Sequence, residues 1–157
     1  MSDGEVVATS EQDFLRHYLA VLAYRTQKAT RDAPPKYFDF QAGNDVRSPT
    51  DILHHMTQLM TYAVTRLTGG CEPIDVADPV ERFHQALGQL STVLHETEAD
   101  RDTLRRLLQG PLADAMTHVG QLAMLRRLAE SLIRRESFFE ADITADNTST
   151  TQPLPED

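Results

Sequence analysis

Two segments of the chain carry side chains whose types and spacing suit the binding of a metal ion. His54 and His55 are adjacent in one segment, and Asp114 and His118 stand four residues apart in another. A four-residue spacing stacks two side chains one turn above the other on a helix. A histidine from one helix, facing a histidine and a carboxylate on a second helix, would supply three ligands. Such a site leaves coordination positions open for water or substrate.

The two adjacent histidines differ in where a helix would point them. His55 falls at the edge of an apolar stripe, whereas His54 points nearly the opposite way, towards solvent. The stripe consists of Ile52, Met56, Leu59, Met60, Ala63 and Leu67. We therefore expect His55, and not His54, to reach the core.

The second segment places Asp114 and His118 on the apolar face of its helix. That face is made of Ala115, Val119, Leu122, Leu125 and Ala129. A buried carboxylate needs a partner or a metal, because an unpaired buried charge is costly. A metal-free arrangement fits the same spacing: Asp114 could pair with His118 at the rim of the core, and His55 with Asp51 one turn earlier. The spacing leaves both alternatives open.

The other residues able to carry chemistry are scattered. His17, His84 and His95 belong to other helical segments, and we expect them to be surface or rim residues without a function. Gln121 lies on the flank of the candidate site, where it could orient a ligand. Cys71 is the only cysteine, which excludes an intrachain disulfide and a zinc site built of cysteines. We expect it to be inert, in a loop between helices.

Four long segments have the apolar periodicity of helices, and none shows the sustained alternation of a strand. The starts are marked by capping residues and prolines, and the ends by glycine or proline. The predicted helices cover about residues 10–28, 48–68, 78–98 and 110–131. A short basic turn, Arg101–Leu108, precedes the last helix. The prediction is an all-α fold: an up-down four-helix bundle of antiparallel helices, with a short extra helix and a long first crossover connection around Lys36–Arg47.

The chain divides into one domain and two polar ends. Residues 1–9 are expected to be disordered, 10–143 to form the helical bundle, and 144–157 to be a disordered tail rich in acidic residues, Thr and Pro. Within the domain, Leu132–Ile143 carries enough apolar side chains to pack against the helices. We expect removal of residues 147–157 to leave stability unchanged.

Composition limits the classes of function. A chain of 157 residues is the size of one domain. Its net charge of −9 argues against binding to nucleic acid, which depends on basic side chains. No apolar run is long enough to cross a membrane, and the N-terminus lacks the pattern of a secretory signal. We therefore expect a cytoplasmic protein.

At the residues of the candidate site the sequence resembles the DinB-like superfamily, also called the DinB/YfiT type, of metal-dependent four-helix-bundle proteins. The specific matches are Arg47–Met56 and Gly110–Gln121, within a similarity of helix order from Phe14 to Ser131. In this family a histidine of the second helix and two histidines four residues apart in the last helix bind a divalent metal, often nickel or zinc. The resemblance implies His55 and His118 as ligands.

The sequence departs from the family's pattern at one ligand position, and the resemblance also implies a class of metal, an oligomeric state and an activity. Asp114 stands where the family has its remaining histidine, so that a charged oxygen replaces a neutral nitrogen. This ligand set suits Ni, Zn, Fe or Mn and does not choose among them. The family implies a homodimer and a metal-dependent hydrolase or thiol transferase acting on a small molecule or thiol. The alternative is a non-catalytic stress-response or interaction module with a vestigial metal site. The replacement of the family's histidine by Asp114 favours this alternative. Binding of DNA is opposed by the net charge.

Overall fold

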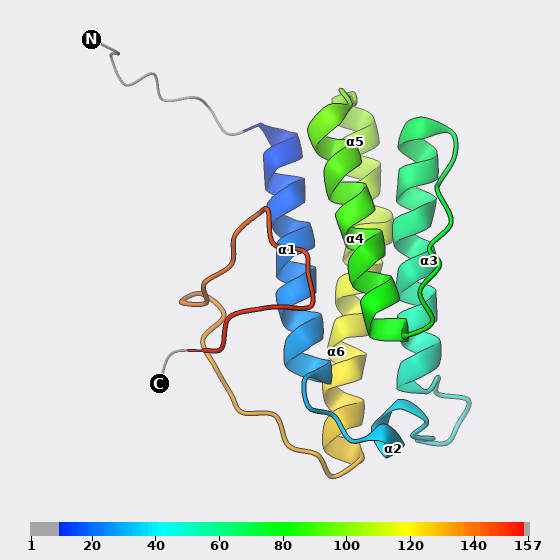
Figure 1. Cartoon of the computed structure of the whole chain (residues 1–157), viewed down its shortest axis with the longest axis vertical. Helices are drawn as coiled ribbons and strands as arrows, with labels where there is room; N and C mark the ends of the chain where they lie inside the picture. The colour runs from blue at the N-terminus through cyan, green and yellow to red at the C-terminus, as the bar shows by residue number, and fades with distance from the viewer. Residues whose placement is uncertain (1–9, 156–157) are drawn as a thin grey trace.

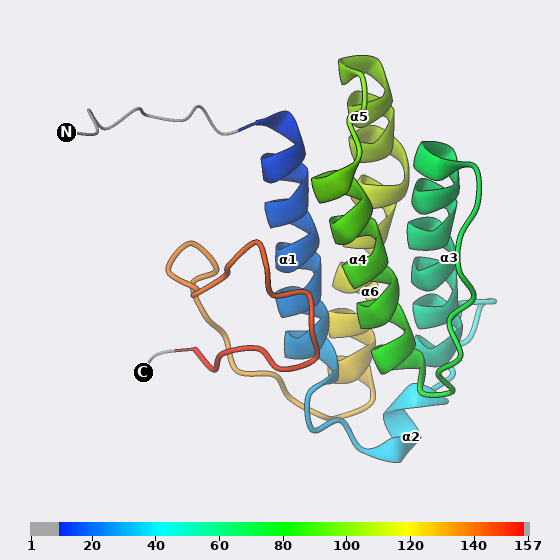
Figure 2. The same ribbon diagram turned by 45° about the horizontal axis from the view of Figure 1, so that its top comes forward.

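The computed structural model of the chain describes residues 10–155, and this part is all-helical, without a strand. Four long helices lie side by side (Figures 1 and 2). They are α1 (Glu11–Thr30), α3 (Pro49–Thr68), α4 (Pro79–Glu96) and α6 (Ala113–Leu128). The shorter elements are α2 (Pro35–Phe38), α5 (Arg101–Leu107) and the π-helix η1 (Leu108–Leu112). The expected all-α class is confirmed, while the expected disorder of residues 1–9 falls outside the described residues.

The long helices pack in a ring. α1 packs against α4 and α6, and α3 packs against the same two helices. α1 and α3 therefore occupy opposite corners, with α4 and α6 between them (Figure 1). This arrangement puts α3 next to α6, the two helices that carry the candidate site.

The helix directions correct the expected alternation of up and down helices. α3 and α4 run in the same direction, because the connection of residues 69–78 returns from the end of α3 to its beginning before α4 starts (Figures 1 and 2). An extended chain covers about 3.3 Å per residue, and a helix rises about 1.5 Å per residue. Ten extended residues can therefore follow the whole length of the 20-residue α3. The first connection, residues 31–48, contains α2 and joins the oppositely directed α1 and α3, which lie at opposite corners of the ring.

α3 begins and ends as its sequence predicts. The Ser48 side chain accepts a hydrogen bond from the backbone N–H of Asp51 (3.2 Å), and Pro49 occupies the first turn, where its missing N–H leaves no bond unmade. Gly69 closes the helix in the left-handed conformation, with φ of 84°. These signals fix where α3 starts, and with it which face of the helix His55 occupies.

α6 continues a longer helix. α5, η1 and α6 follow one another without a break from Arg101 to Leu128, which corrects the expected start at Gly110-Pro111 and the turn before it. In an α-helix, the ring of Pro111 would clash with the carbonyl one turn earlier, and the proline has no N–H to donate. The wider π-helical turn accommodates it. Asp114 lies two residues beyond this turn.

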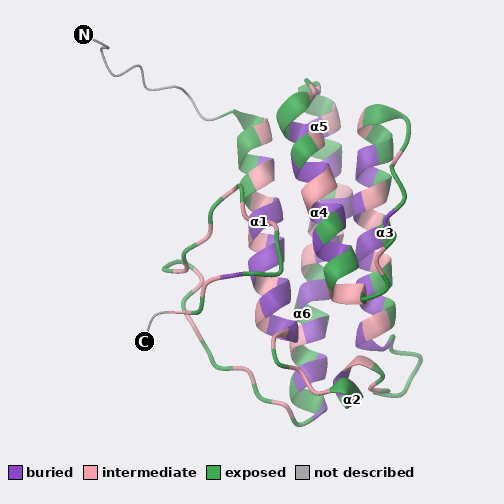
Figure 3. Ribbon diagram, in the orientation of Figure 1, coloured by how far each residue is buried: buried purple, intermediate pink, exposed green. Residues whose placement is uncertain are grey.

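The core lies between the four long helices (Figure 3). Its fully buried side chains include Leu19, Leu22, Met56, Met60, Phe83, Leu87 and Leu122. Tyr37 of α2 is also completely buried, and its hydroxyl donates a hydrogen bond to the carbonyl oxygen of Leu122 (2.8 Å). Tyr37, from the connection between α1 and α3, therefore covers one end of the core. Within residues 10–155, no helix combines the length and apolarity that a membrane crossing requires.

The chain after α6 lies along α1 (Figures 1 and 2). Residues 129–155 contain no helix, yet Gln152 is buried and its carbonyl accepts a hydrogen bond from Arg31 (2.8 Å). The carbonyl of Thr148 accepts a second one from a side chain of α4 (2.9 Å). These contacts correct the expectation that 144–157 is a disordered tail, as far as the described residues go. A polar, Thr-rich segment can dock through its backbone carbonyls, which composition does not reveal.

Candidate metal centre

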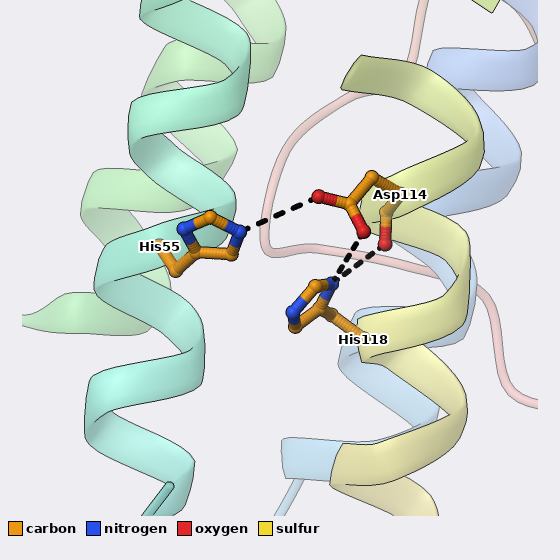
Figure 4. Close-up of side chains that lie close together, drawn as sticks. All are labelled: His55, Asp114 and His118. Atoms are coloured by element: carbon orange, nitrogen blue, oxygen red, sulfur yellow. Dashed lines mark hydrogen bonds and ion pairs between the residues drawn. The ribbon is translucent and has the colours of Figure 1, made fainter. Parts of the chain in front are cut away.

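Three side chains named from the sequence meet between α3 and α6 (Figure 4). α3 supplies His55, and α6 supplies Asp114 and His118, with ligand atoms that all lie within 4.8 Å of one another. The two imidazole rings lie 4.8 Å apart, measured between their centroids. The Nε2 atom of His55 lies 3.4 Å from Oδ2 of Asp114. This group could hold a metal ion.

The distance between His55 and Asp114 is long for a hydrogen bond and is also the distance expected between two ligands of one ion. Hydrogen bonds between nitrogen and oxygen are usually about 2.7–3.2 Å long, and the Nε2–Oδ2 distance is 3.4 Å. Two ligands about 2.1 Å from one tetrahedral ion lie about 3.4 Å apart. An ion could therefore enter between these two atoms with little rearrangement.

The ring of His118 is oriented by the backbone of its own helix. Its Nδ1 lies 2.7 Å from the carbonyl oxygen of Asp114 and donates a hydrogen bond to it. The contact of the same Nδ1 with Oδ1 of Asp114 is longer, at 3.4 Å, and is the weaker of the two. A proton on Nδ1 leaves Nε2 with a free lone pair. Histidines that bind metals commonly donate their other ring N–H to a carbonyl in this way.

The group lies at the rim of the core and not at its centre. The side chain of His118 is 9% exposed, that of His55 29% and that of Asp114 45%. This corrects the expectation that Asp114 lies on a buried face, because nearly half of its side chain is exposed at the edge of α6. The cost of an unpaired buried carboxylate therefore does not by itself require a metal here. The exposed side is where water or a substrate could approach.

The exposure of the histidines outside the group can also be compared with what the sequence predicts. His54 is exposed, which confirms that it points away from the core. Among the residues that the structure describes, His55 pairs with Asp114 and forms no ion pair with Asp51. His17 and His95, which were expected at the surface or rim, are exposed as well. Gln121, which the sequence left open as a residue that orients a ligand, is also exposed.

The expectation that His84 lies at the surface or rim is wrong, because this residue is buried and only 4% exposed. Its Nδ1 donates a hydrogen bond to the carbonyl of Thr148 (2.9 Å), and its Nε2 accepts one from the amide of Gln27 (3.2 Å). Burial lowers the pKa of His84 to about 4, so that the ring is neutral. Cys71 lies half-buried in the connection between α3 and α4, where burial raises the pKa of its thiol. Neither residue belongs to the metal group.

Comparisons of the chain with family models, with curated proteins and with solved structures find no match. The likeness to the DinB-like superfamily therefore rests on the two sequence segments around His55 and His118.

Proposed function

We propose that this chain is a divalent-metal-binding protein of the DinB-like type, with His55, Asp114 and His118 as its metal ligands. One observation carries the proposal. Two imidazoles and a carboxylate from two different helices offer ligand atoms within 4.8 Å of one another. The backbone hydrogen bond at Nδ1 of His118 supports it, because this bond leaves Nε2 available to a metal.

The proposal extends to the topology of the fold. We take α1, α3, α4 and α6 as the four helices of a DinB-like bundle. The family draws its ligands from the second and the last helix, which correspond here to α3 and α6. These two helices are in contact, and each contributes to the group. Bundle cores commonly build metal sites from side chains on facing helices in this manner.

The types of ligand atom restrict the ion to a few divalent transition metals. Two neutral nitrogens and one carboxylate oxygen suit Zn²⁺, Ni²⁺, Fe²⁺ or Mn²⁺. Three protein ligands leave at least one position for a water or a substrate atom. Asp114, with its side chain 45% exposed, places that open position on the solvent side of the group. The carboxylate also offsets one positive charge of the ion.

The activity we propose is metal-dependent transfer of a small thiol, ahead of hydrolysis. A divalent ion held by this group would supply acidification of a coordinated water or thiol. Asp114 directs Oδ2 at His55 and Oδ1 at His118, so that both of its oxygens are already engaged with the other ligands. The group itself contains no further acid or histidine to act as a base. A thiol that coordinates a metal would release its proton to solvent as the metal–sulfur bond forms, so that this step requires no base in the group.

A second candidate function is a non-catalytic interaction module. Asp114 lies within 3.4 Å of both imidazoles and could serve them as a charge partner without any ion. In that case the group contributes to stability, and the chain would act through its surfaces alone.

Cobalt substitution separates these functions. The protein is stripped with a chelator and titrated with Co²⁺, and absorption is recorded before and after adding N-acetylcysteine or, as a matched control, N-acetylserine. We expect one Co²⁺ per chain and a thiolate-to-cobalt absorption with the thiol only. Asp114→Ala should lose this signal, and His54→Ala, at an exposed neighbouring histidine, should keep it. Cobalt binding without a thiol signal would reject thiol transfer. No cobalt binding would favour the interaction module.

A further inference from the structure

A cavity separate from the metal group lies on the face of α6 that is turned to α1. Its volume is about 560 Å³, and its walls come from α1, α6 and the segment Ile133–Phe138 that follows α6. His118 faces α3 instead, and none of the three metal-group residues lines this cavity. The volume lies within the range of about 300–1,000 Å³ that small-molecule sites occupy.

The charge of the cavity is opposite to that of the chain. Five of the chain's 15 basic residues line it, although the net charge of the chain is −9. The five are Arg25, Lys28, Arg127, Arg134 and Arg135. The only acid in the lining is Glu136, whose side chain is 4% exposed. Its oxygens are already bound by Lys28 (3.0 Å) and by the hydroxyl of Tyr24 (2.6 Å). An excess of positive charge therefore faces the cavity.

Several of these cations have no anion of their own. Within residues 10–155, the side chains of Arg25, Arg127 and Arg135 form no hydrogen bond or ion pair. Arg25 lies over the ring of Phe138, with the central guanidinium carbon 3.8 Å from the ring centroid. Guanidinium groups are well suited to bind carboxylates and phosphates through paired hydrogen bonds. Unused donors at one cavity indicate an anionic ligand.

The rest of the lining is apolar. It includes Met116, Val119, Ala123, Met124, Ile133 and Phe138. Phe138 contacts two neighbouring side chains: Arg25 lies over its ring, and Tyr24 forms an edge-to-face contact with it, with ring centroids 6.2 Å apart. A bare inorganic ion would leave this apolar surface in water. An anion with a hydrocarbon body would cover it and gain from its burial.

We propose that this cavity binds a small organic carboxylate with an apolar body. The carboxylate lies against the guanidinium groups of Arg127 and Arg135 at the exposed side, and the body lies against Phe138 and the apolar face of α6. The site uses no residue of the metal group, so that it can be tested on the protein with or without a metal. It also gives the docked segment Ile133–Phe138 a role as one wall of a binding site.

The test is calorimetric titration with three probes: octanoate, the uncharged octanamide and inorganic phosphate. We expect saturable binding of one octanoate per chain, and much weaker binding of the other two. Arg127→Glu/Arg135→Glu, which changes two exposed residues, should raise the Kd for octanoate about tenfold or more. The matched control is Arg66→Glu/Arg105→Glu, which makes the same change of charge at exposed residues outside the lining. It should leave the Kd within about twofold.

Four results would overturn the proposal. Octanoate that fails to saturate means that there is no site. Equal affinity for octanoate and octanamide means that the arginines do not select an anion. Phosphate that binds as tightly as octanoate removes the role of the apolar wall. Equal losses in the two double variants would assign the effect to net charge and not to this cavity.

Discussion

The Nδ1 atom of His118 lies 2.7 Å from the backbone carbonyl oxygen of Asp114, one helical turn earlier. The same carbonyl also accepts a hydrogen bond from the hydroxyl of Thr117 (2.7 Å). One peptide group of α6 therefore sets the orientation of the His118 ring, and the carboxylate of the same residue is the candidate ligand. The ring is held before any metal arrives, which reduces the cost of assembling the site.

This relationship predicts different roles for the two ring nitrogens of His118: Nδ1 donates the hydrogen bond that orients the ring, and Nε2 binds the metal. An asparagine can place its amide N–H near the position of Nδ1, but has nothing at the position of Nε2. His118→Asn should therefore lose zinc affinity by about 10-fold or more, while its melting temperature falls less than that of His118→Ala. Competition with a chromophoric chelator and thermal unfolding of the apo-protein measure the two effects. Zinc affinity that survives in His118→Asn would mean that Nε2 is not the ligand.

Asp114 is the test of whether the group is a metal site or an ion pair. Asp114→Ala should weaken zinc or nickel binding, because it removes the only anionic ligand of the group. Asp114→His should retain or increase the affinity, since imidazole is a good ligand for both ions. The apo-protein should change little in either case, because i,i+4 pairs contribute only about 0.2–0.5 kcal/mol. If Asp114 serves only as an ion-pair partner, both variants will have the metal content of the unaltered protein.

Removal of residues 144–157 should destabilise the protein. Nδ1 of the buried His84 would lose its acceptor, the carbonyl of Thr148, and Arg31 would lose the carbonyl of Gln152. A hydrogen bond of this kind contributes about 0.5–1.5 kcal/mol to stability. Urea unfolding of the truncated chain should show a loss of this size, compared with a control that lacks only residues 156–157. Equal unfolding midpoints would show that, in solution, the contacts of this segment with His84 and Arg31 do not stabilise the fold.

The buried His84 makes stability depend on pH. Its pKa is lowered from 6.5 to about 4 in the folded chain, because burial disfavours the charged ring. The unfolded chain then binds a proton between pH 6.5 and 4 that the folded chain does not bind. The contribution is therefore complete above pH 6.5 and is lost as the pH falls towards 4, by about 3 kcal/mol at most.

Urea unfolding at pH 7 and at pH 4.5 tests this dependence. His84→Asn should be less stable than the unaltered chain at pH 7, but should lose less stability on acidification. His17→Asn, at an exposed histidine, should lose as much as the unaltered chain. The same acid-induced loss in all three proteins would show that carboxylates, and not His84, govern the effect.

Periodic patterns predicted the parts of the molecule that depend on one helix at a time. The wheel distinguished His55 from His54, because burial of an amphipathic helix follows from its own sequence. Ser48 and Gly69 marked the ends of α3 for the same reason, since caps are local interactions. The sequence predicts that Asp114 lies beside His118 and His55, as the structure shows, but it predicts too buried a position for Asp114. Its wheel angle lies at an edge where small rotations of the helix decide exposure.

Features that join distant parts of the chain could not be predicted in this way. The burial of His84 depends on Gln27 and on Thr148, which lies 64 residues further along the chain. The common direction of α3 and α4 depends on how far an extended connection reaches and not on either helix. The sequence predicts a helix start at Pro111, because a π-helical turn that accommodates a proline leaves no periodic signal of its own.

The proposed function requires that His55, Asp114 and His118 bind one divalent ion together. Crystals of the stripped protein can be soaked in Zn²⁺ and anomalous diffraction recorded on both sides of the zinc absorption edge. We expect a single strong zinc peak about 2.0–2.2 Å from Nε2 of His55, Nε2 of His118 and a carboxylate oxygen of Asp114. A peak that is missing from this group, or that lies beyond bonding distance of any one of the three side chains, would contradict the proposal.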